Sequence, residues 1–248
     1  MKFATAKEHR DFFQKNGWIE FEDFISNEQL ILINQSINQV LSDRLKVTPQ
    51  RLRTISSENI YMQGRDLWRS NSPLQKFISQ PRFGEIVSEL VEKKVFRLGY
   101  DQLLPARYQV QFSESTSKIY TKFLEQSLTL EAVSCLQGVT CGIMFALGEI
   151  ENQESTNEMP ASGSGDNSEG INVFPSKPGR VIFFQPNVNI NWHELYSNPG
   201  QSFYLIVYTQ ATAHYQLQPQ DPHTHDLKRL GYIFNDKLSD KLHPIVYR

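Results

Sequence analysis

The segment from residue 171 to 210 constrains the fold most, because it reads as two β-strands joined by turns around one histidine, His193. A Pro-Gly turn precedes the apolar run Val181–Phe184, which predicts a short buried strand. Residues 186–191 are expected to form a loop, and Ser202–Tyr208 is expected to run back as a second strand. A histidine at the mouth of an antiparallel pair can present its side chain to the interior of a barrel-like sheet.

Another strand is predicted at Gly138–Leu147, where bulky and small side chains alternate. The bulky face carries Val139, Cys141, Ile143, Phe145 and Leu147. The other face carries Thr140, Gly142, Met144 and Ala146. A face of small residues leaves room for a ligand where a sheet lines a cavity. Close packing against an opposing helix or sheet explains the same pattern equally well.

The first part of the chain predicts helices around a strand. Thr5–Glu8 fits a capping box, and the short helix that follows should end at Gly17. Trp18–Phe24 alternates as a strand. Ser26–Gln29 is a second capping box, and an amphipathic helix follows it. The apolar stripe of this helix consists of Leu30, Ile33, Ile37, Val40 and Leu41.

Residues 48–63 have no clean period and predict a loop with at most one β segment, whereas Pro73 and Pro81 each mark a helix start. From Val95 onward the pattern turns to β. Residues 149–170 are acidic and rich in Ser, Gly and Asn, so they cannot bury enough apolar surface to order themselves. They predict a mobile loop, either an unstructured insertion or a lid.

Composition indicates one globular domain over residues 1–248, with 39% hydrophobic and 21% charged residues. A net charge of −2 provides no global attraction to nucleic acid or membrane. No apolar run is long enough to cross a bilayer and the N-terminus lacks a signal-like apolar region, so a cytoplasmic location is expected. Cys135 and Cys141 are too few for a disulfide scaffold and are expected to be core thiols.

Several motifs resemble the phytanoyl-CoA-dioxygenase-like family of non-haem Fe(II)/2-oxoglutarate oxygenases. They are FFQKNGWIEFEDFISNEQL, PLQKFISQPRFGEIVSELV with the YDQLL after it, PGRVIFFQP…NWHELYSNPGQSFYLIVY and HTHDLKRLGYIFNDKLSDKLHP. The resemblance implies an α+β fold built on a double-stranded β-helix, a jelly-roll or cupin-like barrel with N-terminal and middle helices packed outside. It implies a helical and strand part at 1–95, a β-helix core at 96–215 and a C-terminal extension at 216–248.

The same resemblance makes His193 the remnant of the distal iron ligand. Members of the family complete a 2-His-1-carboxylate triad with a His-x-Asp pair. The region where that pair is expected, residues 100–134, contains no histidine. The chain therefore resembles a divergent member that lacks the pair. Three carboxylates are the salvage ligands that would accompany His193: Glu114, Glu125 and Glu131. One imidazole with one carboxylate makes a weak, labile site.

The family's arginine that binds 2-oxoglutarate is also absent, because residues 201–204 (Gln-Ser-Phe-Tyr) carry no positive charge at the matching place. Arg97, Arg107 and Lys122 lie on or near expected strands and could substitute from another direction. The expected cofactor is therefore none, with Fe(II) and 2-oxoglutarate expected only if the family activity survives.

Other histidines have structural as well as functional interpretations. His193 is equally a core histidine, hydrogen-bonded beside Trp192. The pair His223 and His225 could chelate a divalent ion with a nearby third group. Asp226 and His214 are the candidates for that third ligand. A surface turn after a proline is the favoured interpretation of this segment.

A small basic cluster has a similar ambiguity. Its members are Arg44, Lys46, Arg51 and Arg53. A phosphate or nucleic-acid contact is the functional interpretation, and a solvated helix end is the favoured one, because the chain is nearly neutral and aromatic residues are not interleaved. A nucleic-acid partner is therefore not expected.

Three functions follow from these patterns, in order of preference. The first is a binding or regulatory protein that keeps the oxygenase-like fold but has lost ordinary dioxygenase catalysis, with a small molecule or a protein as its partner. The second is a divergent Fe(II)/2-oxoglutarate-dependent oxygenase with an unusual metal site. The third is a divalent-metal-responsive transcriptional regulator, a role considered for a small bacterial group that the chain resembles.

Overall fold

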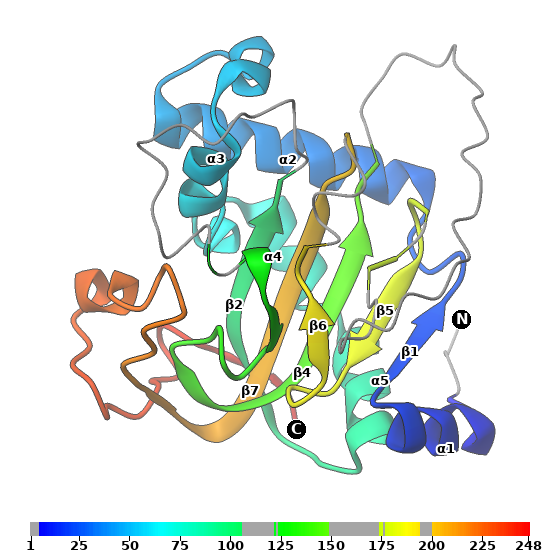
Figure 1. Cartoon of the computed structure of the whole chain (residues 1–248). Coiled ribbons are helices and arrows are strands. Elements are labelled where there is room, and N and C mark those ends of the chain that lie inside the picture. Colours follow the sequence, from blue (N-terminus) through cyan, green and yellow to red (C-terminus); the bar gives the residue numbers. More distant parts are fainter. Residues whose placement is uncertain (1–4, 106–121, 123, 149–173, 176, 194–199) are drawn as a thin grey trace.

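A curled antiparallel sheet with helices against one face forms the body of the protein (Figure 1). The computed structural model describes residues 5–105, 122, 124–148, 174–175, 177–193 and 200–248. The main sheet has six strands in the order β1-β5-β4-β7-β2-β8, and every neighbouring pair is antiparallel. Its strands are β1 (Trp18–Phe21), β2 (Phe96–Leu104), β4 (Leu136–Ala146), β5 (Val181–Phe184), β7 (Phe203–Tyr215) and β8 (Ile245–Tyr247).

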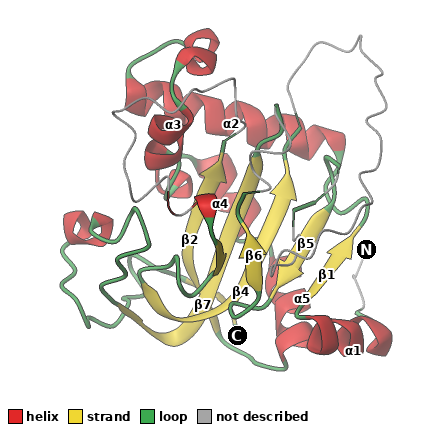
Figure 2. Ribbon diagram, viewed as in Figure 1, coloured by secondary structure: helices red, strands yellow, loops and turns green. Residues whose placement is uncertain are grey.

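A second, two-stranded sheet lies over the face of the main sheet that the long helices leave free (Figure 2). Strand β3 (Ser127–Thr129) pairs with β6 (Asn189–Asn191), so the prediction of a loop over residues 186–191 is wrong in its last three residues. The antiparallel strands and the helices agree with a mixed α and β fold. The double-stranded β-helix and the division at residues 95 and 215 stay predictions.

Helices cover the other face of the main sheet (Figure 2). The α-helices are α1 (Lys7–Asn16), α2 (Asn27–Leu45), α3 (Ser57–Gln63), α4 (Ser72–Ile78) and α5 (Pro81–Val91). Three 3-10 helices accompany them: η1 (Pro49–Thr54), η2 (Leu67–Ser70) and η3 (Asp226–Leu230). Apolar side chains of the helices α2, α4 and α5 form one buried cluster with the facing side of the sheet. No helix in the described ranges is both long and apolar enough to span a bilayer.

Local signals explain where the N-terminal helices begin and end. The Ser26 hydroxyl accepts from the N–H of Gln29 at 3.3 Å, and the Gln29 side chain accepts from the N–H of Ser26 at 3.2 Å, which confirms the predicted capping box. The predicted cap of α1 is displaced by one residue, because Ala6 is the N-cap and its N–H donates to the ring of His9. Gly17 ends α1 in the left-handed conformation, as predicted.

Two other predictions of local structure need correction. Residues 48–63 are helical in η1 and α3 rather than loop, because the Ser56 hydroxyl caps α3 by accepting from the N–H of Asn59. The strand predicted to reach Phe24 ends at Phe21, since Asp23 adopts a positive φ of 49°. The expected mobile loop at 149–170 lies outside the described residues.

A bulge divides the side chains of β4 between the two faces of the sheet. Its register against β7 shifts on both sides of Val139. As a result Val139 packs on the same side as Met144 and Ala146, away from the helices, whereas the sequence pattern placed it with the bulky residues. The remaining bulky residues face the helices as predicted: Cys141, Ile143, Phe145 and Leu147.

Candidate functional site

Aromatic side chains gather on the side of the main sheet that faces the β3–β6 pair, and we call them, together with the glycine that one of them covers, the apolar interior. Its members named here are Gly142, Phe174, Phe184, Trp192 and Phe203. The ring of Phe174 lies 5.1 Å from that of Phe203 and 6.2 Å from that of Trp192, measured between centroids. All these aromatic side chains are buried. The apolar interior is therefore packed by the protein's own rings.

Gly142 shows why the small-residue face of β4 does not leave an open space there. Gly142 is the direct partner of Phe184 across the β4–β5 pair. A Cβ atom added at Gly142 would lie 2.2 Å from Cζ of Phe184, so this ring lies directly on the glycine. The side chain that packs on the glycine thus comes from the neighbouring strand of the same sheet and not from an opposing helix or sheet.

His193 follows β6 and its side chain is exposed. Its neighbour Trp192 is the residue that points inward, with 1% exposure and its indole N–H donating to the carbonyl of Leu128 at 3.0 Å. The interpretation of His193 as a core histidine is therefore wrong. Its role as a remnant metal ligand stays a prediction.

The register of β3 and β6 shows at which end of this strand pair each of the expected carboxylates lies relative to His193. Ser127 pairs with Asn191, so Glu125 and His193 extend from the same end of this pair. Glu131 extends from the opposite end. Both glutamates are exposed, and Glu114 lies outside the described residues.

The donors in the described ranges do not fit the three-ligand iron set. These ranges contain no group of three or more His, Cys, Asp or Glu side chains able to hold a metal ion. The His-x-Asp spacing does occur once, at His9-Arg10-Asp11, but this stretch is helical and lies on α1. Residues two apart on a helix do not face the same way, so this pair cannot chelate like one on a strand.

Of the candidate replacements for the 2-oxoglutarate arginine, Arg97 is engaged by the C-terminal segment. Arg97 is buried, and its guanidinium donates to the carbonyl of His243 at 2.5 Å and to Asp240 at 2.7 Å. It therefore anchors the C-terminal segment. Lys122 is exposed, and Arg107 lies outside the described residues.

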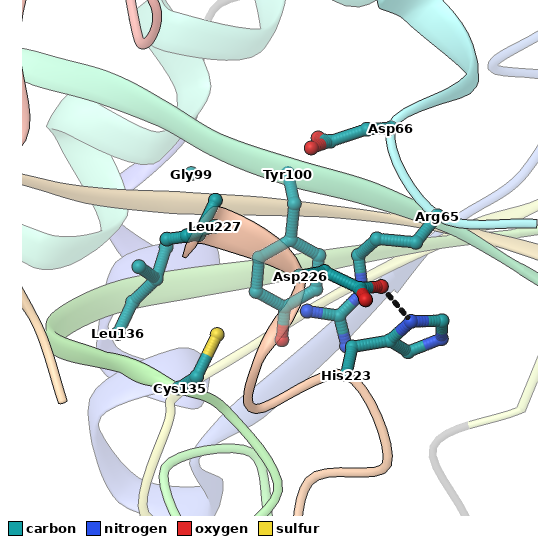
Figure 3. A pocket seen from close by; sticks show the side chains of 9 residues that line it. All are labelled: Arg65, Asp66, Gly99, Tyr100, Cys135, Leu136, His223, Asp226 and Leu227. Carbon is teal, nitrogen blue, oxygen red and sulfur yellow. Dashed lines mark hydrogen bonds and ion pairs between the residues drawn. The ribbon is translucent and has the colours of Figure 1, made fainter. Parts of the chain in front are cut away.

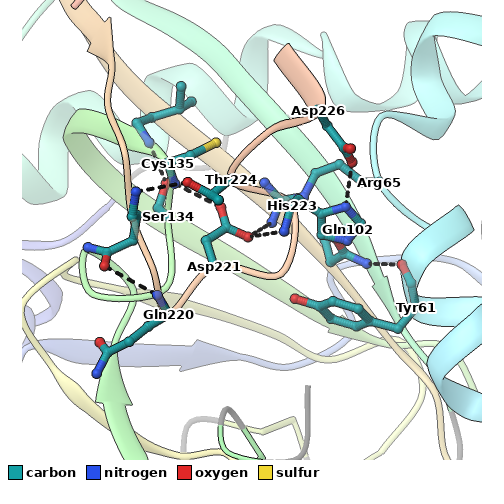
Figure 4. A network of polar contacts seen from close by, with 12 residues as sticks. Tyr61, Arg65, Gln102, Ser134, Cys135, Gln220, Asp221, His223, Thr224 and Asp226 are labelled. Carbon is teal, nitrogen blue, oxygen red and sulfur yellow. Dashed lines mark hydrogen bonds and ion pairs between the residues drawn. The ribbon is translucent and has the colours of Figure 1, made fainter. Parts of the chain in front are cut away.

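A second group consists of charged and polar side chains, all buried except the partly exposed Asp226, and we call it the polar rim (Figure 4). It consists of Arg65, Gln102, Asp221, His223 and Asp226. The guanidinium of Arg65 pairs with Asp221 at 3.2 Å and donates to the side chain of Gln102 at 2.9 Å. It also lies 3.8 Å from the ring centroid of Tyr100, a cation–π contact.

Asp221 connects three segments of the chain. Its second oxygen accepts from the N–H of Cys135 at 2.8 Å, and its first accepts from the N–H of His223 at 2.9 Å. Because the carboxylate is fully buried, this pairing with Arg65 and two N–H groups offsets its loss of hydration. The polar rim thus fixes the C-terminal segment to the sheet.

His223 is 1% exposed, so the prediction of a surface turn is wrong for this residue and right only for the exposed His225. Its ring stacks near Tyr61, 5.1 Å between centroids, and Nδ1 lies 2.6 Å from Asp226. Burial and, next, the nearby Arg65 lower the pKa of His223. The neutral ring therefore donates from Nδ1 to Asp226, which leaves Nε2 as an acceptor. Nε2 is buried and has no partner among the described residues.

A cavity of about 10 Å³ opens within this arrangement (Figure 3). That volume is the size of one water molecule. It is lined by Arg65, Asp66, Gly99, Tyr100, Cys135, Leu136, His223, Asp226 and Leu227. The polar rim can hold a water or a small hydrogen-bonding group, and the site is too small for a drug-sized ligand.

Two further predictions can be compared with the structure. The basic cluster is not simply a solvated helix end, because Arg44 donates to the carbonyls of Gln63, Arg65 and Asp66 at 2.6–2.8 Å. Both cysteines are free and buried, which confirms them as core thiols. Burial raises the pKa of Cys141 to about 12, so this thiol is protonated and inert at neutral pH.

No protein-family model matches the chain, and no curated protein matches it significantly. Solved structures do resemble it. The non-heme alpha-ketoglutarate-dependent carbocyclase SnoK from nogalamycin biosynthesis has a TM-score of 0.60 and 14% identity, covering 97% of this chain and 96% of its own. The epimerase SnoN, in complex with Fe3+, alpha-ketoglutarate and nogalamycin RO, has a TM-score of 0.58 and 12% identity, covering 96% of each chain. CytC3 with Fe(II) and alpha-ketoglutarate has a TM-score of 0.50 and 16% identity, covering 87% of this chain and 81% of its own.

Identities this low are evidence of fold alone. Membership in the phytanoyl-CoA-dioxygenase-like family stays a prediction, because no family model matches. The chain has the fold of non-heme iron and alpha-ketoglutarate-dependent enzymes.

Proposed function

We propose that the protein uses an oxygenase-like fold for binding or regulation and has lost ordinary iron-dependent dioxygenase catalysis. The observation that carries this proposal is the ring of Phe184 on Gly142, 2.2 Å from where a Cβ would lie. The ring covers one of the small residues of β4 that suggested a ligand cavity. The positions of the donors give further support, since Glu131 lies at the opposite end of the β3–β6 pair from His193.

A titration under anaerobic conditions tests this proposal. Fe(II) and 2-oxoglutarate are added to the full chain in a calorimeter, and succinate formation is then followed in air. We expect neither stoichiometric binding nor turnover, because the described residues provide no three-ligand set. Binding of one Fe(II) per chain with conversion of 2-oxoglutarate to succinate would refute the proposal.

A divergent oxygenase is the second candidate, and one observation favours it. The strand register puts Glu125 and His193 at the same end of the β3–β6 pair. Mn(II) binding, followed by electron paramagnetic resonance, distinguishes this candidate. If the protein is a divergent oxygenase, His193→Ala and Glu125→Gln should both weaken Mn(II) binding, whereas the control Glu131→Gln should leave Mn(II) binding unchanged. Equal weak binding by all four proteins would remove it.

The partner that we propose is a small molecule or a protein. We do not propose nucleic acid, since Arg44, the first residue of the basic cluster, is engaged by three backbone carbonyls. A metal-responsive regulator would also need a chelating group, and His223 and His225 differ in burial rather than facing one ion.

A further inference from the structure

Behind the polar rim, a carboxyl group is buried between the sheet and a turn of the chain. Asp101 on β2 has no exposed surface. Its Oδ2 accepts from the hydroxyl of Tyr204 on β7 and, at 3.1 Å, from the backbone N–H of Trp68 in η2. Its Oδ1 is buried and has no partner in the described part of the chain. The carboxyl of Asp101 therefore joins η2 to the neighbouring strands β2 and β7 through a single oxygen.

The backbone reinforces this junction at one further point. The N–H of Asp66, which precedes η2, donates to the carbonyl of Asp101 at 3.0 Å. Asp66 also lines the cavity of the polar rim, and the residue before it is Arg65. Any movement of the Asp66–Ser70 turn relative to β2 would therefore change one wall of that cavity.

Charged groups surround Asp101 from each neighbouring element. Asp66 lies in the turn, and its carboxylate pairs with Arg69 at 3.0 Å while keeping one buried oxygen without a partner among the described residues. Arg44 comes from α2 and donates to the carbonyl of Asp66 at 2.8 Å rather than to the carboxylate of Asp101. Asp226, from the C-terminal segment, lines the same cavity as Asp66.

We propose that the carboxyl group of Asp101 is a proton-dependent latch, which in its neutral form holds the Asp66–Ser70 turn on β2 and so makes the polar rim responsive to pH. With a proton on Oδ1, Oδ2 still accepts both hydrogen bonds, and the carboxyl group carries no buried charge. Loss of that proton buries a second negative charge beside Asp66, and repulsion between the two then loosens the turn. The latch is independent of iron, of 2-oxoglutarate and of the proposed binding function.

The direction of the pH dependence follows from the burial. Burial first, and Asp66 second, raise the pKa of Asp101 to about 7, against the opposing effects of Tyr204, Trp68 and Arg44. In the unfolded chain the pKa is near 3.8. Between these values the folded state binds the proton more tightly, so the stabilisation from the neutral carboxyl is present at low pH and is lost as the pH rises through 7.

Hydrogen exchange in the full chain tests the latch. The exchange rate of the Trp68 amide is compared between wild type and Asp101→Asn over a range from about pH 6 to about pH 8, which brackets the expected transition. Asparagine stays neutral and keeps an oxygen that can accept both bonds. We expect wild type to exchange faster than the variant above pH 7 and equally fast below it, whereas the control Asp43→Asn, an exposed acid on α2, follows wild type. The same pH profile in wild type and Asp101→Asn would overturn the latch.

A second variant keeps the proposal testable if Asp101→Asn fails to fold. Asp66→Asn removes the like charge, so the carboxyl carbon of Asp101, followed by NMR, should titrate at a pH lower than in wild type by roughly one unit. Two other results would also overturn the latch. One is a titration of Asp101 in wild type near the pKa of the unfolded chain, and the other is a titration midpoint that is no lower in Asp66→Asn than in wild type.

Discussion

The apolar interior and the polar rim lie next to each other on one side of the sheet, yet different forces stabilise them. In the apolar interior the ring of Phe184 lies directly on Gly142, and stability depends on shape. In the polar rim the guanidinium of Arg65 is buried against Asp221, and stability depends on complete pairing of charges. The two regions should therefore respond to different kinds of substitution.

The comparison also shows where two buried titratable groups of the protein lie. In the family that the sequence resembles, the metal ligands and the cofactor lie inside the barrel. Here the described interior is aromatic, whereas two buried titratable groups lie in the polar rim, with His223 at 1% exposure, and behind it, with Asp101 at 0%. Proton-dependent behaviour is accordingly expected from the polar rim and its surroundings and not from the apolar interior.

The largest effect is expected from Asp221→Ala, which leaves the buried guanidinium of Arg65 without its partner. We expect the free energy of unfolding to fall by about 3–5 kcal/mol, measured by urea denaturation. The matched control is Glu22→Ala, which removes the exposed partner of Arg180 and should cost at most about 1 kcal/mol. Equal losses in the two variants would contradict the assignment of charge pairing to the polar rim.

A smaller loss is expected from Gly142→Ala, because the new Cβ overlaps the ring of Phe184. Overpacking of this kind costs about 1–3 kcal/mol in urea denaturation. Adding Phe184→Leu to Gly142→Ala should restore part of the loss, although Phe184→Leu alone is destabilising. Simple additivity of the two substitutions would show that the ring and the glycine do not interact.

The pH dependence separates the two regions further. Because the folded state lowers the pKa of His223, the unfolded state binds the proton more tightly below pH 6.5, and the stabilisation from the neutral ring is lost as the pH falls. The difference in free energy of unfolding between wild type and His223→Gln should therefore shrink as the pH falls from about 8 to about 5, a range that includes the ordinary pKa of histidine. For Gly142→Ala the difference should not change with pH. Thermal unfolding across this range measures both.

The smallest effect concerns the partial rescue of an unpaired charge. Asp221→Asn keeps the shape of the side chain but leaves Arg65 charged and unpaired. Replacing the cation as well, in Arg65→Met with Asp221→Asn, should recover about 1 kcal/mol relative to Asp221→Asn alone. A double variant less stable than that single variant would mean that packing of Arg65 on Tyr100 matters more than its charge.

Features that depend on short stretches of sequence could be predicted. The capping box at Ser26, the helix end at Gly17 and the strand Val181–Phe184 are all present, since each depends on backbone preferences and neighbouring side chains. The prediction of a loop over residues 48–63 is wrong although the sequence contains a local helix signal there, the cap at Ser56. The bulge in β4 was not visible in the alternation of residues, because it depends on pairing with β7.

By itself the sequence determined the capping box at Ser26, the helix end at Gly17, the strand Val181–Phe184 and the absence of histidine from residues 100–134. The tertiary structure alone decided that His223 is buried, that Phe184 covers Gly142 and that Arg65 meets Asp221 from 156 residues away. The physical reason is the distance along the chain over which each effect acts. Backbone propensities and caps act over a few residues, whereas burial and charge pairing depend on which distant segments the folded sheet brings together.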